Sequence, residues 1–162
     1  MTTIPHKDID AALALLPPKM DSAEARVLLL AIALQESGFK SRRQYGNGPA
    51  RGYWQFEAAG GVIGVLAHHA TASRARIVCG LRDVKPVVQD VHAALEFDDV
   101  LAAAFARLLL WTDRQPLPAI GDERAAWEYY LRTWRPGKPH VERWADNYAR
   151  AVKLHTTPTN ED

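Results

Sequence analysis

The sequence predicts a mainly α-helical protein with little or no sheet, folded as a single domain. Apolar residues recur at helical spacing along most of the chain, and acidic residues precede many of the apolar runs while prolines or glycines follow them. With 162 residues, 48% of them hydrophobic, the chain can bury one core without disulfides. We expect residues 1–155 to form this domain and residues 156–162 to be a flexible C-terminal tail.

Two helices are expected before the first long loop. The segment 6–16 is a short run of helical pattern that a proline pair ends. Asp21, with Glu24 three residues later, predicts a capping box that begins a second, strongly apolar helix. Gly38 is a natural stop just past a helix end, so the second helix is predicted to end at Glu36.

The middle of the chain reads as a glycine-rich loop followed by three helices. Residues 38–54 form the longest irregular stretch before the tail, and any small hairpin is expected there. Helices are then predicted over about residues 56–69 and 71–79. Asp83 is the expected cap of the next helix, with Pro86 in its first turn.

Three further helices are predicted in the C-terminal part. Asp98 opens a run that is apolar nearly all round as far as Trp111, which indicates a central buried helix. After a loop, Asp122 is expected to start a helix that ends before Pro136, and Pro139 is expected to start the last helix.

Composition limits the partners and cofactors. The net charge of +1 gives no electrostatic support for nucleic-acid binding, and a helix-turn-helix over residues 73–91 would lack a strongly basic recognition face. No apolar run is long enough to cross a bilayer. The single cysteine, Cys79, is expected to be a small buried hydrophobe, and the histidines show no metal-ligand spacing. We therefore expect no cofactor, no metal, no nucleic-acid partner and no membrane insertion, and we expect a monomer.

Glu36 is the strongest candidate for chemistry. A helix C-terminus carries partial negative charge, which disfavours an ionised carboxylate. Burial against Leu34, Phe39 and nearby aromatic residues would disfavour the charge as well. Both effects raise the pKa, as is required of a general acid that keeps its proton near neutral pH. From position alone, the alternative is a solvated glutamate at a helix end.

The residues around Glu36 resemble the signature of the lysozyme-like superfamily, nearest to its lytic transglycosylase and goose-type lysozyme branch. Three blocks carry the resemblance in order, namely "QESGF" at 35–39, "ARGYWQFE" at 50–57 and "TWRPGKPHVERW" at 133–144. The resemblance implies a lysozyme-like fold with a catalytic cleft and Glu36 as the catalytic acid and base. The residues expected to bind substrate are Ser37, Tyr53, Trp54, Gln55, Trp134 and Tyr130.

The chain departs from the family in its third block. That block usually begins with tyrosine and asparagine, where this chain has Trp134 and Arg135. In the family a tyrosine often contacts the catalytic glutamate. Tyr129, Tyr130 and Tyr148 are the candidates for that contact, and the sequence does not choose among them.

Several residues near the candidate acid keep two interpretations. The amide of Gln55 can donate to and accept from sugar hydroxyls or an N-acetyl group. Tyr53 and Trp54 offer flat faces for sugar rings, but neighbours in an extended segment point to opposite sides, so one of them is expected in the core. Ser37 either bonds the substrate or caps backbone groups. Glu57 is either a second catalytic carboxylate or a favourable charge in a first helical turn.

The resemblance implies an enzyme that cleaves the β-1,4 bond between N-acetylmuramic acid and N-acetylglucosamine in peptidoglycan. In a lytic transglycosylase the sugar's own hydroxyl attacks and a 1,6-anhydro end forms, whereas in a lysozyme water attacks. The N-terminal residues lack a basic region followed by an apolar stretch, so we expect no secretory signal. We expect a bacteriophage or prophage product such as an endolysin, made in the cytoplasm and acting on the cell wall after release or within a phage particle.

The alternative is a catalytically inactive module of the same fold. Such a module would bind glycan strands or serve as a structural part of a phage particle or secretion machine. An ion pair between Glu36 and Arg51, with no groove reaching the carboxyl, would favour this alternative.

Overall fold

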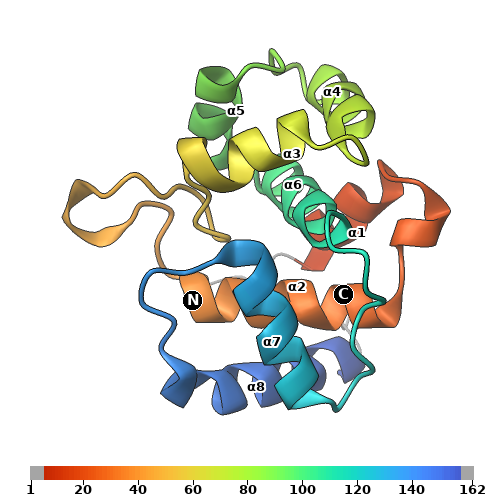
Figure 1. Ribbon diagram of the computed structural model, residues 1–162, viewed down its shortest axis with the longest axis vertical. Coiled ribbons are helices and arrows are strands. Elements are labelled where there is room, and N and C mark those ends of the chain that lie inside the picture. The colour runs from red at the N-terminus through yellow and green to blue at the C-terminus, as the bar shows by residue number, and fades with distance from the viewer. Residues whose placement is uncertain (1–5, 158–162) are drawn as a thin grey trace, which may run out of the picture.

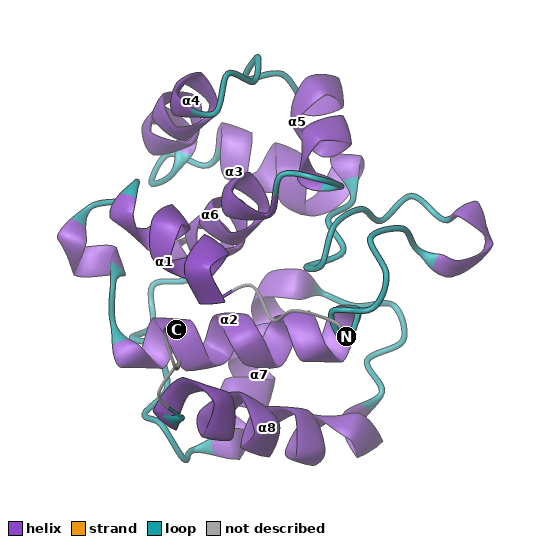
Figure 2. Cartoon of the chain, turned by 180° about the vertical axis from the view of Figure 1, so that it is seen from behind, coloured by secondary structure: helices purple, strands orange, loops and turns teal. Residues whose placement is uncertain are grey.

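Eight α-helices account for most of residues 6–157, the part of the chain that this computed structural model describes (Figures 1 and 2). They are α1 (His6–Ala14), α2 (Ala23–Glu36), α3 (Ile63–Ala67), α4 (Ala72–Leu81), α5 (Val88–Leu95), α6 (Asp99–Trp111), α7 (Glu123–Trp134) and α8 (Trp144–Thr156). Short 3₁₀ or π-helical turns lie at Pro18–Met20, Tyr45–Asn47, Ala58–Val62 and Val141–Arg143. The prediction of a mainly α-helical single domain is confirmed.

Helix α6 is the centre of the fold. Its residues 100–110 are all buried, as the apolar pattern predicted. Helix α1 packs along α6, and α2 packs along α8. Both views place α3, α4 and α5 at one end of the molecule and α2, α7 and α8 at the other, with α6 between the two groups (Figures 1 and 2). The two groups therefore share one core through α6.

Helix α2 begins one residue later than the capping-box prediction implied. The hydroxyl of Ser22, not the carboxylate of Asp21, accepts the hydrogen bond from the Ala25 amide, at 3.1 Å. Asp21 instead forms an ion pair with Arg26 at 3.1 Å. Both residues have an extended backbone, and it is Ser22, the residue directly before the first helical residue, that acts as the cap.

The C-terminus of α2 is set by a glycine. Gly38 has a φ of +64°, which an L side chain rarely adopts, and its amide donates to the carbonyls of Ala33 and Leu34 at 3.0 Å each. These bonds satisfy carbonyls that the helix itself leaves free. Glu36 is therefore the last residue of α2, as predicted.

The loop after α2 is tied to α5 and α6. Gly52 has a φ of +75°, and a Cβ at this position would lie 2.3 Å from the Leu95 carbonyl oxygen, so only glycine lets the loop come this close. Arg42 forms an ion pair with Asp99, and Arg43 forms one with Glu96 at 2.5 Å. The expected hairpin is reduced to two isolated β-bridges, which pair residue 51 with residues 43 and 56.

Two predicted helices of the middle region start in the wrong place. The segment 56–57 is extended, a π-helical turn covers Ala58–Val62, and only Ile63–Ala67 is α-helical. The glycine pair at 60–61 disfavours a regular helix start, which explains the delay. Asp83 does not cap α5, because Val87 occupies the cap position and Pro86 lies outside the helix. The helix predicted at 71–79 is confirmed as α4.

The C-terminal helices follow their predicted caps. Asp98 accepts a hydrogen bond from the Leu101 amide at 3.0 Å, and Asp122 accepts one from the Ala125 amide at 3.1 Å. The last helix begins later than Pro139, with α8 starting at Trp144 after a 3₁₀ turn. The predicted tail mostly falls outside the described residues, which end at 157. Among the described residues, no helix is long and apolar enough to cross a membrane.

Candidate active site

The Glu36 carboxyl is bonded to a tyrosine from α7. The Tyr130 hydroxyl donates to Glu36 Oε1 at 2.5 Å and so joins the C-terminus of α2 to α7. The Tyr130 ring stacks on Trp144, with centroids 5.4 Å apart and planes 5° apart, and Trp127 packs against it at 5.4 Å. Because Tyr130 is only 2% exposed, this aromatic packing fixes the direction of the hydroxyl.

The other candidate tyrosines have different partners. The Tyr129 hydroxyl donates to the Leu110 carbonyl at 2.9 Å, and the Tyr148 hydroxyl accepts from the Gly121 amide at 2.9 Å. Only Tyr130, among the tyrosines in the described part of the chain, bonds the candidate acid. The sequence carried a signal for this choice, because Tyr130 stands three residues after Trp127 and four before Trp134, on one face of a helix.

Glu36 is an acid without a cation. Among residues 6–157, no lysine, arginine or histidine nitrogen forms an ion pair with its carboxylate. Arg51 in particular donates to the carbonyls of Gly48 and Ala50 instead. The ion pair that would have favoured an inactive module is therefore not formed in this structure.

The surroundings hold the proton on Glu36. Burial raises the pKa of Glu36 from 4.5 to about 7, and the negative charge of Glu57 acts in the same direction. The hydrogen bond from Tyr130 opposes both effects, because it stabilises the carboxylate. Near neutral pH the carboxyl can therefore both give and take a proton. Burial, with the nearby Glu36, raises the pKa of Tyr130, so its hydroxyl stays protonated.

Burial alternates along the second block of the sequence signature. Trp54 is completely buried, and its indole Nε1 donates to the Leu29 carbonyl at 3.0 Å. Its predicted role in binding substrate is wrong, because an indole enclosed in the core cannot stack on a sugar ring. Tyr53 is the exposed member of the pair, and the Arg42 guanidinium lies 4.3 Å from the centre of its ring.

Gln55 and Trp134 both keep partial exposure. The Gln55 side-chain amide donates to the Gly52 carbonyl at 2.9 Å, which leaves its carbonyl oxygen available as an acceptor. The Trp134 indole donates to the Trp54 carbonyl at 3.0 Å, so it connects α7 to the segment that carries Gln55. Its ring lies 6.0 Å from Phe56.

The Ser37 hydroxyl forms hydrogen bonds with backbone groups. Its hydroxyl donates to the Tyr53 carbonyl at 2.7 Å and accepts from the Phe39 amide at 3.2 Å. These bonds tie the end of α2 to the loop segment opposite. They favour the structural interpretation of Ser37 over direct contact with a substrate.

Glu57 is an exposed carboxylate that acts on Glu36 through its charge. It stands at the cap position of the π-helical turn, and its side chain makes no capping hydrogen bond. The alternative interpretation, a charge in the first turn of an α-helix, is wrong because no α-helix begins here. Its negative charge raises the pKa of Glu36, so the two carboxylates are near enough to interact.

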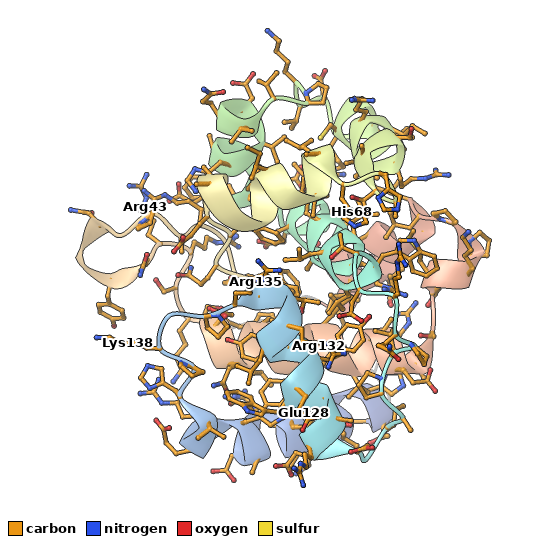
Figure 3. All side chains as sticks on the ribbon, viewed as in Figure 1. Arg43, His68, Glu128, Arg132, Arg135 and Lys138 are labelled. Atoms are coloured by element: carbon orange, nitrogen blue, oxygen red, sulfur yellow. The ribbon has the colours of Figure 1, made fainter. Side chains whose placement is uncertain are left out.

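Basic side chains lie at the C-terminal end of α7. Figure 3 shows Arg132 and Arg135 along this helix and Lys138 in the loop after it. Arg132 pairs with Asp113 at 3.0 Å, whereas Arg135 and Lys138 are exposed and form no ion pair within residues 6–157. They are free to meet an anionic ligand near Trp134. In the same residues no group of three or more His, Cys, Asp or Glu side chains could hold a metal ion.

Neither of two pockets in the described residues borders Glu36. One lies beneath Trp111 and the other beside His6. The candidate acid is instead reached from the open surface, where it keeps partial exposure.

No protein-family model, curated protein or solved structure matches the chain.

Proposed function

We propose that the protein cleaves the β-1,4 bond between N-acetylmuramic acid and N-acetylglucosamine in peptidoglycan, as a lytic transglycosylase of the lysozyme-like kind. The observation that carries the proposal is the Glu36 carboxyl, which ends α2, has no cationic partner among residues 6–157 and accepts a hydrogen bond from the buried Tyr130. An acid in this setting can donate a proton at neutral pH. Peptidoglycan is proposed as the substrate because three blocks of the sequence resemble this superfamily.

In the proposed reaction Glu36 first acts as the general acid. Its proton passes to the glycosidic oxygen as the bond from the muramoyl C1 breaks, and N-acetylglucosamine leaves with a free hydroxyl. The Glu36 carboxylate then takes the proton of the muramoyl C6 hydroxyl, whose oxygen bonds to C1 to form the 1,6-anhydro ring. The Tyr130 hydroxyl stabilises the carboxylate between these two transfers.

The sugar would lie against partly exposed residues of the segments that contact Ser37 and Tyr130, the neighbours of Glu36. Tyr53 and Trp134 provide aromatic faces, and Gln55 provides an amide acceptor for a hydroxyl or an N-acetyl N–H. Glu57 is the residue that would activate water if the reaction were hydrolysis, because a hydrolase uses a second carboxylate. Arg135 and Lys138 can meet the carboxylates of the peptide stems.

The test is a digest of purified peptidoglycan, with the products weighed by mass spectrometry. Wild type is expected to release fragments one water lighter than ordinary reducing muropeptides. Glu36→Gln is expected to lower the rate by about 10²–10⁴-fold, since it removes the proton donor but keeps the shape. Glu128→Gln is the matched control, because this exposed glutamate of α7 pairs only with the neighbouring Arg124.

Two outcomes would redirect the proposal. Reducing-end fragments from wild type would identify a hydrolase and make Glu57→Gln the next variant. No cleavage of walls of several chemotypes would leave the alternative, a catalytically inactive glycan-binding or structural module of a phage particle or secretion machine. Two features favour that alternative: the departure from the family at Trp134 and Arg135, and the position of both pockets away from Glu36.

A further inference from the structure

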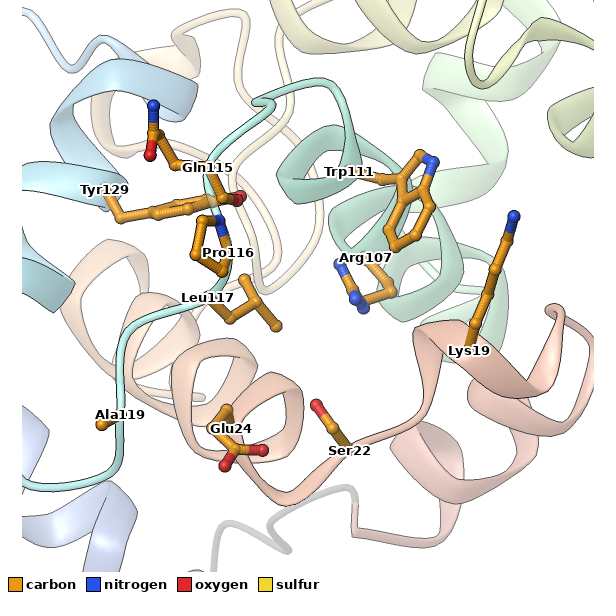
Figure 4. Close-up of a pocket in the computed structure, with 10 residues that line it drawn as sticks. All are labelled: Lys19, Ser22, Glu24, Arg107, Trp111, Gln115, Pro116, Leu117, Ala119 and Tyr129. Atoms are coloured by element: carbon orange, nitrogen blue, oxygen red, sulfur yellow. The ribbon is translucent and has the colours of Figure 1, made fainter.

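A pocket of about 410 Å³ lies at the other end of α2 from Glu36. It is formed between the start of α2, the C-terminal end of α6 and the loop that follows α6 (Figure 4). Figure 4 shows the Arg107 guanidinium beneath the Trp111 indole, with Lys19 on one side and Leu117 on the other. The pocket therefore combines two cations with an aromatic face and an apolar wall.

Arg107 is a buried cation without a carboxylate. It is 3% exposed, and no acidic side chain of residues 6–157 forms an ion pair with it. Asp21 acts on it only at longer range and is itself paired with Arg26. A buried charge of this kind is costly unless a partner compensates it. Since no carboxylate of the described residues pairs with Arg107, a bound anion could be its partner.

The free edge of Arg107 faces the pocket. Its Nε donates to the Met20 carbonyl at 2.7 Å, and this is the guanidinium's one hydrogen bond within the described residues. No fully buried side-chain nitrogen or oxygen there lacks a partner, so the two terminal nitrogens must reach open space. Because Arg107 lines the pocket, that space is the pocket itself. Two parallel N–H donors on one planar edge match the two oxygens of a carboxylate.

The remaining lining limits the ligand further. Lys19 places its ammonium 5.4 Å from the centre of the Trp111 ring, the same distance as the Arg107 guanidinium carbon. Glu24 is the one carboxylate of the lining, so a single added negative charge neutralises the pocket. The indole of Trp111 and the side chain of Leu117 offer apolar surface next to these charges.

We propose that this pocket binds a small monoanionic carboxylate with an apolar substituent, held by Arg107 and Lys19 and packed against Trp111. The C-terminus of an apolar peptide and a free organic acid share this chemistry. The site is separate from the candidate active site, since Glu24 and Glu36 are twelve positions apart on one helix, which corresponds to about 18 Å. It does not depend on the proposed cleavage of peptidoglycan.

Binding can be measured by NMR on the full chain, from the indole N–H signal of Trp111. The probe is N-acetyl-leucine, and its uncharged counterpart N-acetyl-leucinamide is the matched control. We expect saturable shifts with a millimolar Kd for the acid, as suits a ligand of this size, and no saturation with the amide. Benzoate in a parallel titration distinguishes a free organic acid from a peptide terminus, since only the latter carries the amide group.

Charge variants should change the affinity for the acid in opposite directions, which a general loss of structure would not do. Arg107→Met is expected to weaken binding at least about tenfold, because it removes hydrogen bonds to a charged group. Lys19→Met, at an exposed position, is expected to weaken it about two- to fivefold, and Glu24→Gln to tighten it by a similar factor. Lys7→Met makes the same charge change on α1, outside the pocket, and is expected to change nothing.

Three results would overturn the proposal. The first is the absence of saturable binding of N-acetyl-leucine to wild type, and the second is equal affinity for the amide. The third is tighter binding of inorganic phosphate than of the carboxylate under the same conditions. If Arg107→Met fails to fold, the opposite effects of Lys19→Met and Glu24→Gln decide the question, and equal effects of the two would also contradict the proposal.

Discussion

The two ends of α2 each lie beside a buried ionisable group that forms no ion pair in the described part of the chain, an acid at one end and a base at the other. At the C-terminus of the helix, Glu36 is a partly buried acid that forms no ion pair within residues 6–157, and near its N-terminus Arg107 is a buried cation that forms none there either. The acid can avoid its charge by keeping a proton, but a guanidinium stays charged in a protein. Burial of an unpaired charge is unfavourable at both ends of the helix. At one end it favours a carboxyl that exchanges a proton, and at the other end it favours binding of an anion.

Charged side chains elsewhere, where the loop after α2 meets α5 and α6, are paired. Arg42 bonds both oxygens of Asp99, and Arg43 bonds Glu96, at the junction of the loop with α6. These ion pairs hold the loop in place. The functional candidates in the described part of the chain are therefore the buried ionisable groups that form no ion pair, Glu36 and Arg107.

The largest expected effect is the pH dependence of stability that Glu36 imposes. Its raised pKa makes the folded state hold a proton that the unfolded state has lost, so this contribution is complete below pH 4.5 and disappears as the pH rises to about 7. Relative to Glu36→Gln, the free energy of unfolding of wild type is expected to fall by up to about 3 kcal/mol across this range. Urea unfolding at several pH values measures it, and parallel curves for the two proteins would contradict it.

Paired and unpaired arginines should respond differently to substitution. Arg42→Met leaves Asp99 without its partner and is expected to lower the free energy of unfolding by about 1–2 kcal/mol. Arg107→Met leaves no carboxylate behind, only the neutral Met20 carbonyl, so the loss of free energy of unfolding should be smaller than for Arg42→Met. Denaturant unfolding of both variants at one pH makes the comparison. An equal loss in the two would show that Arg107 is compensated after all.

Removing the tyrosine hydroxyl should make Glu36 hold its proton more strongly. The hydrogen bond from Tyr130 lowers the pKa of Glu36, so Tyr130→Phe is expected to raise that pKa above 7, by about one unit. A ¹³C NMR titration of the Glu36 carboxyl measures the shift. Tyr148→Phe is the control, because that hydroxyl bonds a backbone amide instead. A fall in the pKa with Tyr130→Phe would mean that the hydroxyl stabilises the protonated form.

The smallest expected effect comes from Glu57. Its negative charge raises the pKa of Glu36, so Glu57→Gln is expected to lower that pKa by a few tenths of a unit at low salt. The difference should shrink in high salt, since Glu57 is exposed and screened. The same titration at two ionic strengths tests this. A salt-independent shift would point to a change of structure.

The sequence predicted the elements whose signals are local. The end of α2 at Glu36, the caps at Asp98 and Asp122 and the buried α6 all depend on neighbouring residues, and the structure confirms them. The burial of Cys79, which raises the pKa of its thiol to about 11, also follows from residue type.

What the sequence could not supply are contacts between distant segments. The sequence predicted that one of Tyr53 and Trp54 lies in the core, but it did not reveal that this is Trp54, whose indole reaches the Leu29 carbonyl in α2. Tyr130 shares a helix face with Trp127 and Trp134 in the sequence, but only the packing of α7 on α2 and α8 shows that this face meets Glu36. The pocket around Arg107 was not predicted at all, because its walls come from three separate parts of the chain.

The bond between Glu36 and Tyr130 also has a consequence for synthesis of the chain. The two residues are 94 positions apart, so α2 leaves the ribosome long before the helix that carries its partner. Until α7 has been made and packed, Glu36 has neither its hydroxyl donor nor its aromatic cover, and it titrates as an ordinary glutamate. A nascent or prematurely ended chain thus contains the glutamate but not its raised pKa, and a carboxyl that keeps its proton near neutral pH exists only in the nearly finished protein.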